Sequence, residues 1–88
     1  MIRWDKLKDD WLKKTRGVSF QEISDLILSG FFLDILENPK RPNQDIFVLW
    51  LHEYVWVVPF VVEPSGSIFL KTAYPSRKMQ KRYGEKNA

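Results

Sequence analysis

The longest apolar run in the chain, YVWVVPFVV at residues 54 to 62, is the feature that most constrains its fold. A strand with almost no polar position is typical of one that is covered on both faces or lies at the centre of a sheet. Pro59 interrupts the pattern, because a proline cannot donate a hydrogen bond to a neighbouring strand. We therefore predict a strand over residues 55 to 62, with a bulge at Pro59 or with its nitrogen facing an edge.

Further strands are expected before and after this run. FFLDIL at residues 31 to 36 and the segment 46 to 51 precede it, separated by NPKRPNQD, which reads as a turn or an exposed loop. The two longer strands are expected to join near residues 52 to 54. After the turn EPSGS, a last strand is predicted over residues 68 to 74.

The N-terminal part is predicted to form a short strand at residues 2 to 4 and then two helices. Asp5 stands at an N-cap position ahead of KLKDDWLKKTR, and Gly17 follows as a C-terminal glycine. These residues favour a first helix between Asp5 and Gly17.

The second helix has a capping box, S-x-x-E, at its start. Ser19 and Glu22 form this box, and Val18 is placed to pack on Ile23 as a hydrophobic staple. Gly30 is the expected C-terminal glycine of this helix. Its predicted buried stripe contains Phe20, Ile23, Leu26 and Ile27.

These elements predict an α+β fold with the order β-α-α-β-β-β-(α), in which two N-terminal helices pack on a small antiparallel sheet. The length of 88 residues and the hydrophobic content of 44% indicate one domain, over residues 1 to 88, with a single modest core. Pro75 is expected to open the short C-terminal helix, because its missing N–H is tolerated in a first turn.

Positive charge is concentrated at the C-terminal end. From Lys71 onward the chain has six basic residues and one acidic residue, a net charge of +5, whereas residues 1 to 70 have a net charge of −2. Lysine and arginine attract phosphate and release its counterions, so this end is a candidate phosphate-binding surface. A solvated basic helix face with no binding role is the alternative.

Several functional classes find no support in the sequence. There is no cysteine and only one histidine, so we expect neither a disulfide nor a metal site, and we place the protein in a reducing cytoplasm. Phosphate-binding glycine loops, the H-E-x-x-H motif and the nucleophile-elbow pattern are absent. No cofactor is expected. The N-terminus lacks the apolar region of a signal peptide, and no apolar run is long enough for a membrane helix, so we expect no contact with a membrane.

Both ends of the chain resemble a known family. The opening WDKLKDDWLKKTRGVSFQEISDLI resembles the BrnT-type toxins of bacterial toxin–antitoxin systems, in which a W-D pair, a Lys-rich helix and a G-V-S-F-x-E step follow a short strand. The sequence TAYP at residues 72 to 75 is similar to the end of the last strand in BrnT and in the wider RelE-like ribonuclease fold. The chain has Arg16 where these toxins usually have His, and Tyr74 where they commonly have Arg.

The resemblance implies a RelE-like fold and an endoribonuclease that cleaves mRNA without a metal ion and thereby inhibits translation. It also implies a cognate DNA-binding antitoxin that neutralises the enzyme, and through which an oligomer can form. The two departures from the family pattern, Arg16 and Tyr74, motivate an alternative: a catalytically inactive module on the same fold that holds RNA or a protein partner. A structural subunit whose basic helix docks on an acidic partner is a third possibility.

Metal-free cleavage of RNA uses the 2′-hydroxyl as nucleophile, so the site needs a base, an acid and cations for the phosphate charge. The candidate catalytic cations are Arg77 and Lys71. The other candidates for contact with RNA are Lys13, Lys14, Arg16, Thr72, Lys78, Lys81, Arg82 and Tyr83.

Candidates for proton transfer are fewer. His52 is the only side chain that ordinarily titrates near neutral pH. Its expected place in a turn beside Glu53 favours an exposed histidine with no role. Tyr74 and Tyr83 could orient phosphate, stack on a base or donate a proton, or they could be ordinary packing residues.

The four tryptophans are assigned to packing rather than to the site. Trp4 and Trp11 are expected in the core. Trp50 and Trp56 are expected to pair across adjacent strands.

Overall fold

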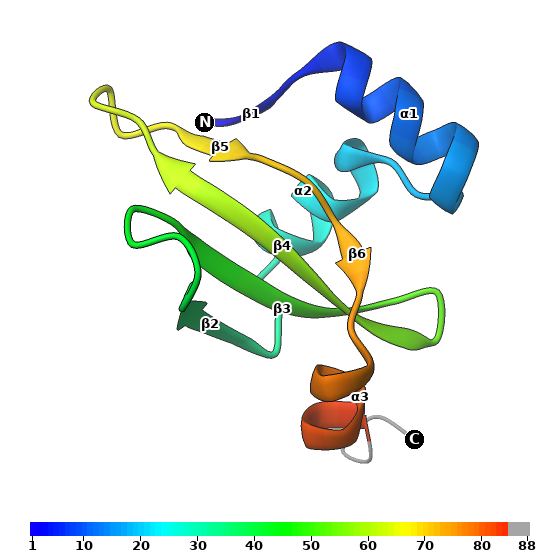
Figure 1. Cartoon of the computed structure of the whole chain (residues 1–88). Helices are drawn as coiled ribbons and strands as arrows, with labels where there is room; N and C mark the ends of the chain where they lie inside the picture. The colour runs from blue at the N-terminus through cyan, green and yellow to red at the C-terminus, as the bar shows by residue number, and fades with distance from the viewer. Residues whose placement is uncertain (85–88) are drawn as a thin grey trace.

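A computed structural model describes residues 1–84 of the chain (Figure 1). The elements follow the order β-α-α-β-β-β-β-β-α, so the α+β class is confirmed. Their bounds are β1 Ile2–Trp4, α1 Lys6–Arg16, α2 Phe20–Leu28, β2 Asp34–Glu37, β3 Asp45–Leu51, β4 Tyr54–Val62, β5 Ile68–Leu70, β6 Tyr74–Pro75 and α3 Arg77–Tyr83.

The strands form one sheet in the order β1-β5-β4-β3-β2, and β6 pairs with β4 beyond the end of β5. β1 runs parallel to β5, whereas the other pairs are antiparallel. The prediction of an antiparallel sheet was therefore wrong for β1. Parallel neighbours need a long connection, and the helices and strands between β1 and β5 provide one.

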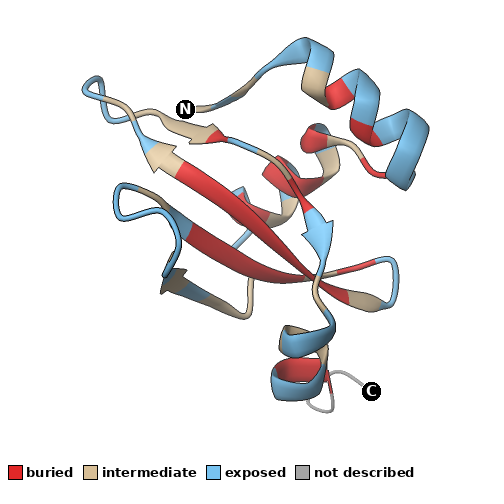
Figure 2. Cartoon of the chain, in the orientation of Figure 1, coloured by how far each residue is buried: buried red, intermediate tan, exposed pale blue. Residues whose placement is uncertain are grey.

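The apolar run of β4 lies in the middle of the sheet, as predicted, and both of its faces are covered (Figure 2). Side chains of β3 and β4 alternate between two buried clusters. The larger cluster is shared with α1 and α2 and contains Leu12, Phe20, Ile23, Ile27, Phe47, Leu49, Trp56, Val58 and Phe60 among others. The smaller cluster, on the opposite face, contains Val48, Val55, Val57 and Tyr83 of α3. Burial on both faces explains why this strand has so few polar positions.

Pro59 lies beside a bulge. β5 ends opposite Phe60, and β6 begins opposite Val57, so three residues, 71–73, face only Val58 and Pro59. The register between β3 and β4 runs through Pro59 without interruption, so the bulge predicted in β4 is absent, and the additional residue belongs to the opposing segment. Lys71 N–H donates to the Pro59 carbonyl over 2.8 Å, so the proline presents its nitrogen to this interrupted part of the ladder. The bulge also divides the predicted last strand, residues 68 to 74, into β5 and β6.

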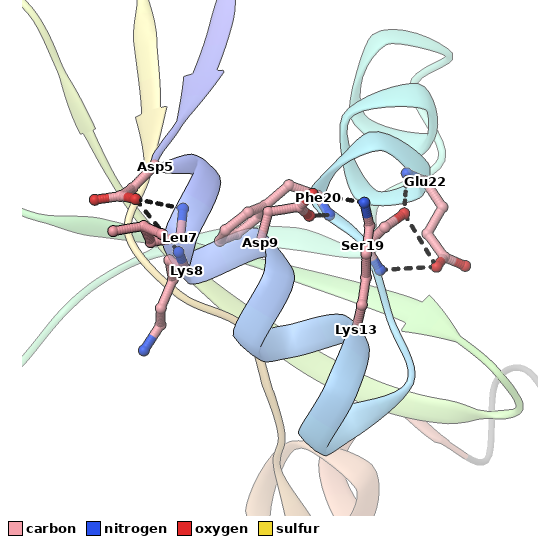
Figure 3. A network of polar contacts seen from close by, with 8 residues as sticks. All are labelled: Asp5, Leu7, Lys8, Asp9, Lys13, Ser19, Phe20 and Glu22. Atoms are coloured by element: carbon pink, nitrogen blue, oxygen red, sulfur yellow. Dashed lines mark hydrogen bonds and ion pairs between the residues drawn. The ribbon is translucent and has the colours of Figure 1, made fainter.

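The termini of α1 and the start of α2 form as the sequence predicts. Asp5 accepts hydrogen bonds from the N–H groups of Leu7 and Lys8, and Gly17 is left-handed with φ 68°. Ser19 and Glu22 form a complete capping box at the start of α2 (Figure 3).

The end of α2 is a Schellman motif. Gly30 has φ 77°, Gly30 N–H donates to the Ile27 carbonyl, and Phe31 N–H donates to the Leu26 carbonyl. Because Phe31 takes part in this motif, the strand expected over residues 31 to 36 begins only at Asp34.

The N-terminus of α3 differs from the prediction. Pro75 does not open the helix: α3 begins at Arg77, and Ser76 is its cap, with its Oγ accepting from Met79 N–H over 3.2 Å. Pro75 instead lies in β6 opposite Trp56. α3 is fixed to β4 through Val55, whose carbonyl accepts from Ser76 N–H (3.0 Å) and whose N–H donates to Gln80 Oε1 (2.9 Å).

Within residues 1–84, no helix has the length and apolar character needed to span a membrane.

Candidate nucleic-acid interface

A groove lies beside Tyr74, where β6, the 38–44 loop, the β5–β6 bulge and the start of α1 meet. Its main hollow has a volume of about 520 Å³, and an adjoining hollow of about 290 Å³ shares Asn38, Lys40 and Tyr74 with it. We call the two together the basic groove. The main hollow is lined by Lys8, Asn38, Lys40, Arg41, Gln44, Pro59, Lys71, Thr72 and Tyr74, and the second adds Pro39, Ile46, Val57, Ser76, Lys78 and Met79.

The charge of the basic groove is entirely positive. Its cations are Lys8, Lys40, Arg41, Lys71 and Lys78, and no carboxylate is among the residues that line it. In the described part of the chain, ion pairs join Arg3 to Glu63, Lys13 to Asp9 and His52 to Glu22, and none includes a cation of the groove. Such an uncompensated cluster raises the local concentration of anions and favours a polyanion such as nucleic acid.

Tyr74 is the aromatic residue of the groove. Its side chain is 40% exposed, while its backbone is paired with Val57 of β4. A ring held on a strand with one face open to solvent can stack on a nucleobase.

Arg16 fixes the segment that carries Tyr74. Its guanidinium donates a hydrogen bond to the carbonyl of the buried Ala73 and lies 4.7 Å from the centre of the Trp11 ring. A planar guanidinium can stack and donate at the same time. Arg16 therefore reaches the wall of the groove from α1, but it binds the protein backbone there and does not line the groove.

The bulge places Lys71 and Thr72 in the groove together with Tyr74. A β-bulge bends the strand and changes the direction of its side chains. Lys71 is exposed, and its Nζ lies 5.4 Å from the centre of the Phe69 ring. These three predicted site residues are brought together by the structure.

The other predicted cations of the C-terminal end lie mainly elsewhere. Arg77, Lys78, Lys81 and Arg82 line a separate shallow hollow on α3. Only Lys78 also lines the basic groove, so it links the two surfaces. Arg77 is thus placed on the helix face and not in the groove beside Tyr74.

His52 lies outside the groove. It occupies the β3–β4 turn, with φ 52°, at the end of β3 opposite the 38–44 loop (Figure 1). Its Nε2 is 2.7 Å from Glu22 Oε1, so it connects this turn to the capping box of α2. Burial of the Glu22 carboxyl acts to raise its pKa, but hydrogen bonds from Ser19 and His52 outweigh this and lower the pKa below its ordinary value.

Tyr83 and Lys13 are also engaged within the protein. Tyr83 is buried and donates its hydroxyl hydrogen to Asp34 Oδ2 over 2.6 Å, which raises the pKa of the phenol. Lys13 Nζ lies 3.0 Å from Asp9 Oδ2, and this hydrogen-bonded ion pair raises the pKa of Lys13. Neither residue lines the groove. Lys14 is exposed and lies outside the groove too.

Sequence reasoning missed the contribution of Lys8 and of the 38–44 loop. Lys40 and Arg41 stand between two prolines in that loop, and Asn38 and Gln44 flank them. A basic pair in a loop bounded by prolines was the available signal. It was read only as a turn, because nothing in the sequence places this loop beside the last strand.

Two expectations about the tryptophans were wrong. Trp11 is 42% exposed and has Lys8 Nζ 4.3 Å from its ring centre, so it belongs to the surface next to the groove and not to the core. Trp50 is opposite Val55 and Trp56 is opposite Leu49, so the two indoles lie on opposite faces of the sheet and do not pair. Trp4 does pack on the core, stacked on Phe20.

Among residues 1–84, no three His, Asp or Glu side chains are grouped so that they could hold a metal ion. Comparisons of the chain with protein-family models, with curated proteins and with solved structures find no match. The functional argument therefore depends on the groove itself.

Proposed function

We propose that this protein is a metal-independent endoribonuclease that cleaves mRNA in the basic groove and acts as the toxin of a bacterial type II toxin–antitoxin system. The observation that carries the proposal is a groove with five cations, no carboxylate and an exposed tyrosine. The resemblance of WDKLKDDWLKKTRGVSFQEISDLI to BrnT-type toxins supports the toxin assignment. A RelE-like fold, a cytoplasmic location and a cognate antitoxin that covers the groove belong to the same proposal.

The groove offers the cations and a proton donor for metal-free cleavage of RNA. When the 2′-oxygen attacks the phosphorus, charge builds up on the phosphate oxygens, and Lys71 and Arg41 are placed to stabilise it. The Tyr74 hydroxyl can protonate the leaving 5′-oxygen, and its ring can hold a base. The proton of the 2′-hydroxyl would pass to a water molecule, because neither hollow of the groove is lined by a histidine or a carboxylate.

A second candidate function is binding of RNA without cleavage. It is favoured by one specific feature: neither hollow of the basic groove is lined by a histidine or a carboxylate, the usual general bases. His52, the single histidine of the chain, is bound to Glu22 outside the groove. In this alternative the five cations and Tyr74 hold the RNA chain, and Tyr74 acts only as a stacking platform.

The test is cleavage of a long single-stranded RNA in EDTA by purified wild-type protein and by four variants, Lys71→Ala, Tyr74→Phe, Arg77→Ala and Lys6→Ala. Lys6 is exposed and lies outside the groove, so Lys6→Ala is the matched control for Lys71→Ala. We expect discrete cuts by wild type and by the control, and a loss of about 10²–10³ in rate for Lys71→Ala. We expect Arg77→Ala to lose less than Lys71→Ala, because Arg77 lies outside the groove.

A gel-shift experiment on the same samples separates the two candidates. RNA that stays intact but is retarded by wild type, and less by Lys71→Ala, would favour the binding module. Intact RNA with no retardation at low salt would rule out both functions.

A further inference from the structure

The 38–44 loop is organised before any ligand binds. Asn38 Oδ1 accepts from Lys40 N–H over 3.1 Å, and Asn38 N–H donates to the Gln44 carbonyl over 3.2 Å. Arg41 N–H donates to the Asn38 carbonyl, and Gln44 N–H donates to the Arg41 carbonyl. Two prolines, at positions 39 and 42, fix φ at their positions. The loop is thus closed by its own backbone and by one amide side chain.

This loop presents Lys40 and Arg41 to solvent at the groove. Both residues are exposed, and both line the main hollow on the side contributed by the loop, facing the segment that carries Lys71 and Thr72. Within residues 1–84, neither side chain has a carboxylate partner. Two unpaired cations on an ordered loop bind an anion without the entropy loss that a flexible loop would incur.

We propose that the 38–44 loop is a preformed phosphate-binding arm for single-stranded RNA. In this arrangement Lys40 and Arg41 hold the phosphate next to a base that stacks on Tyr74, while Lys71 holds the neighbouring phosphate on the opposite wall. The inference depends on the RNA-binding part of the proposed function and adds the substrate class and the residues that select it.

The preference for single-stranded RNA follows from the side chains that line the main hollow. Tyr74 offers a ring face, and Asn38 and Gln44 place amide side chains among the residues that line the same space. A base can meet an aromatic face and amide groups only when it is unstacked and unpaired, whereas duplex RNA buries its base faces and offers a narrow major groove. The phosphates alone would be bound from either form.

The experiment measures affinity for a short 2′-O-methyl RNA, which has no 2′-hydroxyl to attack the phosphate, as a single strand and as a duplex over a range of salt concentrations. Lys40→Ala/Arg41→Ala is compared with Arg3→Ala/Lys6→Ala. The control pair removes one arginine and one lysine that are exposed and lie outside the groove, so the net charge is matched.

We expect wild type and the control pair to bind the single strand more tightly than the duplex. Because Lys40 and Arg41 hold one phosphate, their loss should reduce the slope of log K against log salt by about 0.7, which corresponds to roughly 5-fold weaker binding at 0.1 M salt. Asn38→Ala opens the loop without removing charge, so we expect weaker binding of the single strand with an unchanged salt slope.

Equal slopes for Lys40→Ala/Arg41→Ala and the control pair would overturn the phosphate-binding arm but leave RNA binding in place. Equal affinity of wild type for single strand and duplex would overturn the assigned substrate class. No binding of either RNA by wild type would overturn the proposed function and this inference together.

Discussion

Asp9 connects the two N-terminal helices, and its replacement tests how they are held together. This residue is only 7% exposed, although it lies on a helix of charged residues. Oδ1 accepts from Phe20 N–H over 2.8 Å, at the first residue of α2, and Oδ2 lies 3.0 Å from Lys13 Nζ (Figure 3). One carboxylate thus caps α2 from α1.

The expected loss of stability in Asp9→Ala follows from these contacts. Asp9→Ala leaves the N–H of fully buried Phe20 without its acceptor, which costs about 1–3 kcal/mol in free energy of unfolding. The same change removes an anion from a helix N-terminus, an interaction of about 0.3–1 kcal/mol. We expect a total loss of about 2 kcal/mol and a melting temperature lower by roughly 10 °C. Asp9→Asn keeps an acceptor oxygen, so its loss in free energy of unfolding should be less than half that of Asp9→Ala.

The assay is urea unfolding followed by tryptophan fluorescence, with Lys13→Ala as the control. Lys13→Ala removes the ion pair and leaves the cap, so its loss should be much smaller than that of Asp9→Ala. If Asp9→Ala and Lys13→Ala were equally stable, the bond to Phe20 would not contribute, and the reasoning would be refuted.

Two further changes test contacts of the sheet. Gln80→Ala leaves the buried N–H of Val55 without its acceptor and should lower the free energy of unfolding by about 1–3 kcal/mol. Urea denaturation measures this loss, with Lys81→Ala, on the exposed side of α3, as the control. A loss no larger than that of Lys81→Ala would contradict the role of the Gln80 side chain. The lowered pKa of Glu22 contributes stability that is present above pH 4.5, its ordinary pKa, and is lost as the pH falls through the folded-state value. Glu22→Gln should therefore weaken the acid dependence of the melting temperature. Glu37→Gln, on the exposed surface of β2, is the control, and an equal change in both variants would contradict the role of Glu22.

The parts of the fold that could be predicted are those fixed by residues close in sequence. The capping box links Ser19 to a residue three positions away, and the Asp5 cap and the left-handed glycines at 17 and 30 act over similar distances. Continuous apolar character likewise placed β4 at the centre of the sheet. Each of these signals depends on local geometry and does not require knowledge of a distant segment.

The parts that could not be predicted depend on which distant strands become neighbours. The parallel pairing of β1 with β5 joins segments more than sixty residues apart. The opposite faces of Trp50 and Trp56 depend on the β3–β4 register, which a shift of one residue would reverse. The site shows the same division: Lys71, Thr72 and Tyr74 are close in sequence and were predicted together, whereas the 38–44 loop reaches them only through the folded chain.

The two positions at which the chain departs from the BrnT pattern, Arg16 and Tyr74, lie on either side of a single residue in space. Arg16 donates to the carbonyl of Ala73, and Tyr74 follows Ala73 directly, with its ring open to the groove. A guanidinium reaches this carbonyl while it stacks on Trp11, a pair of contacts that suits its long, planar side chain. The cation at position 16 thus serves to fix the strand end, and the side chain at position 74 presents an aromatic ring where the family pattern has a cation. Positive charge at the groove comes from Lys8, Lys71, Lys78 and the 38–44 loop, so Arg16 and Tyr74 act together to shape one wall of the groove without adding a cation to it.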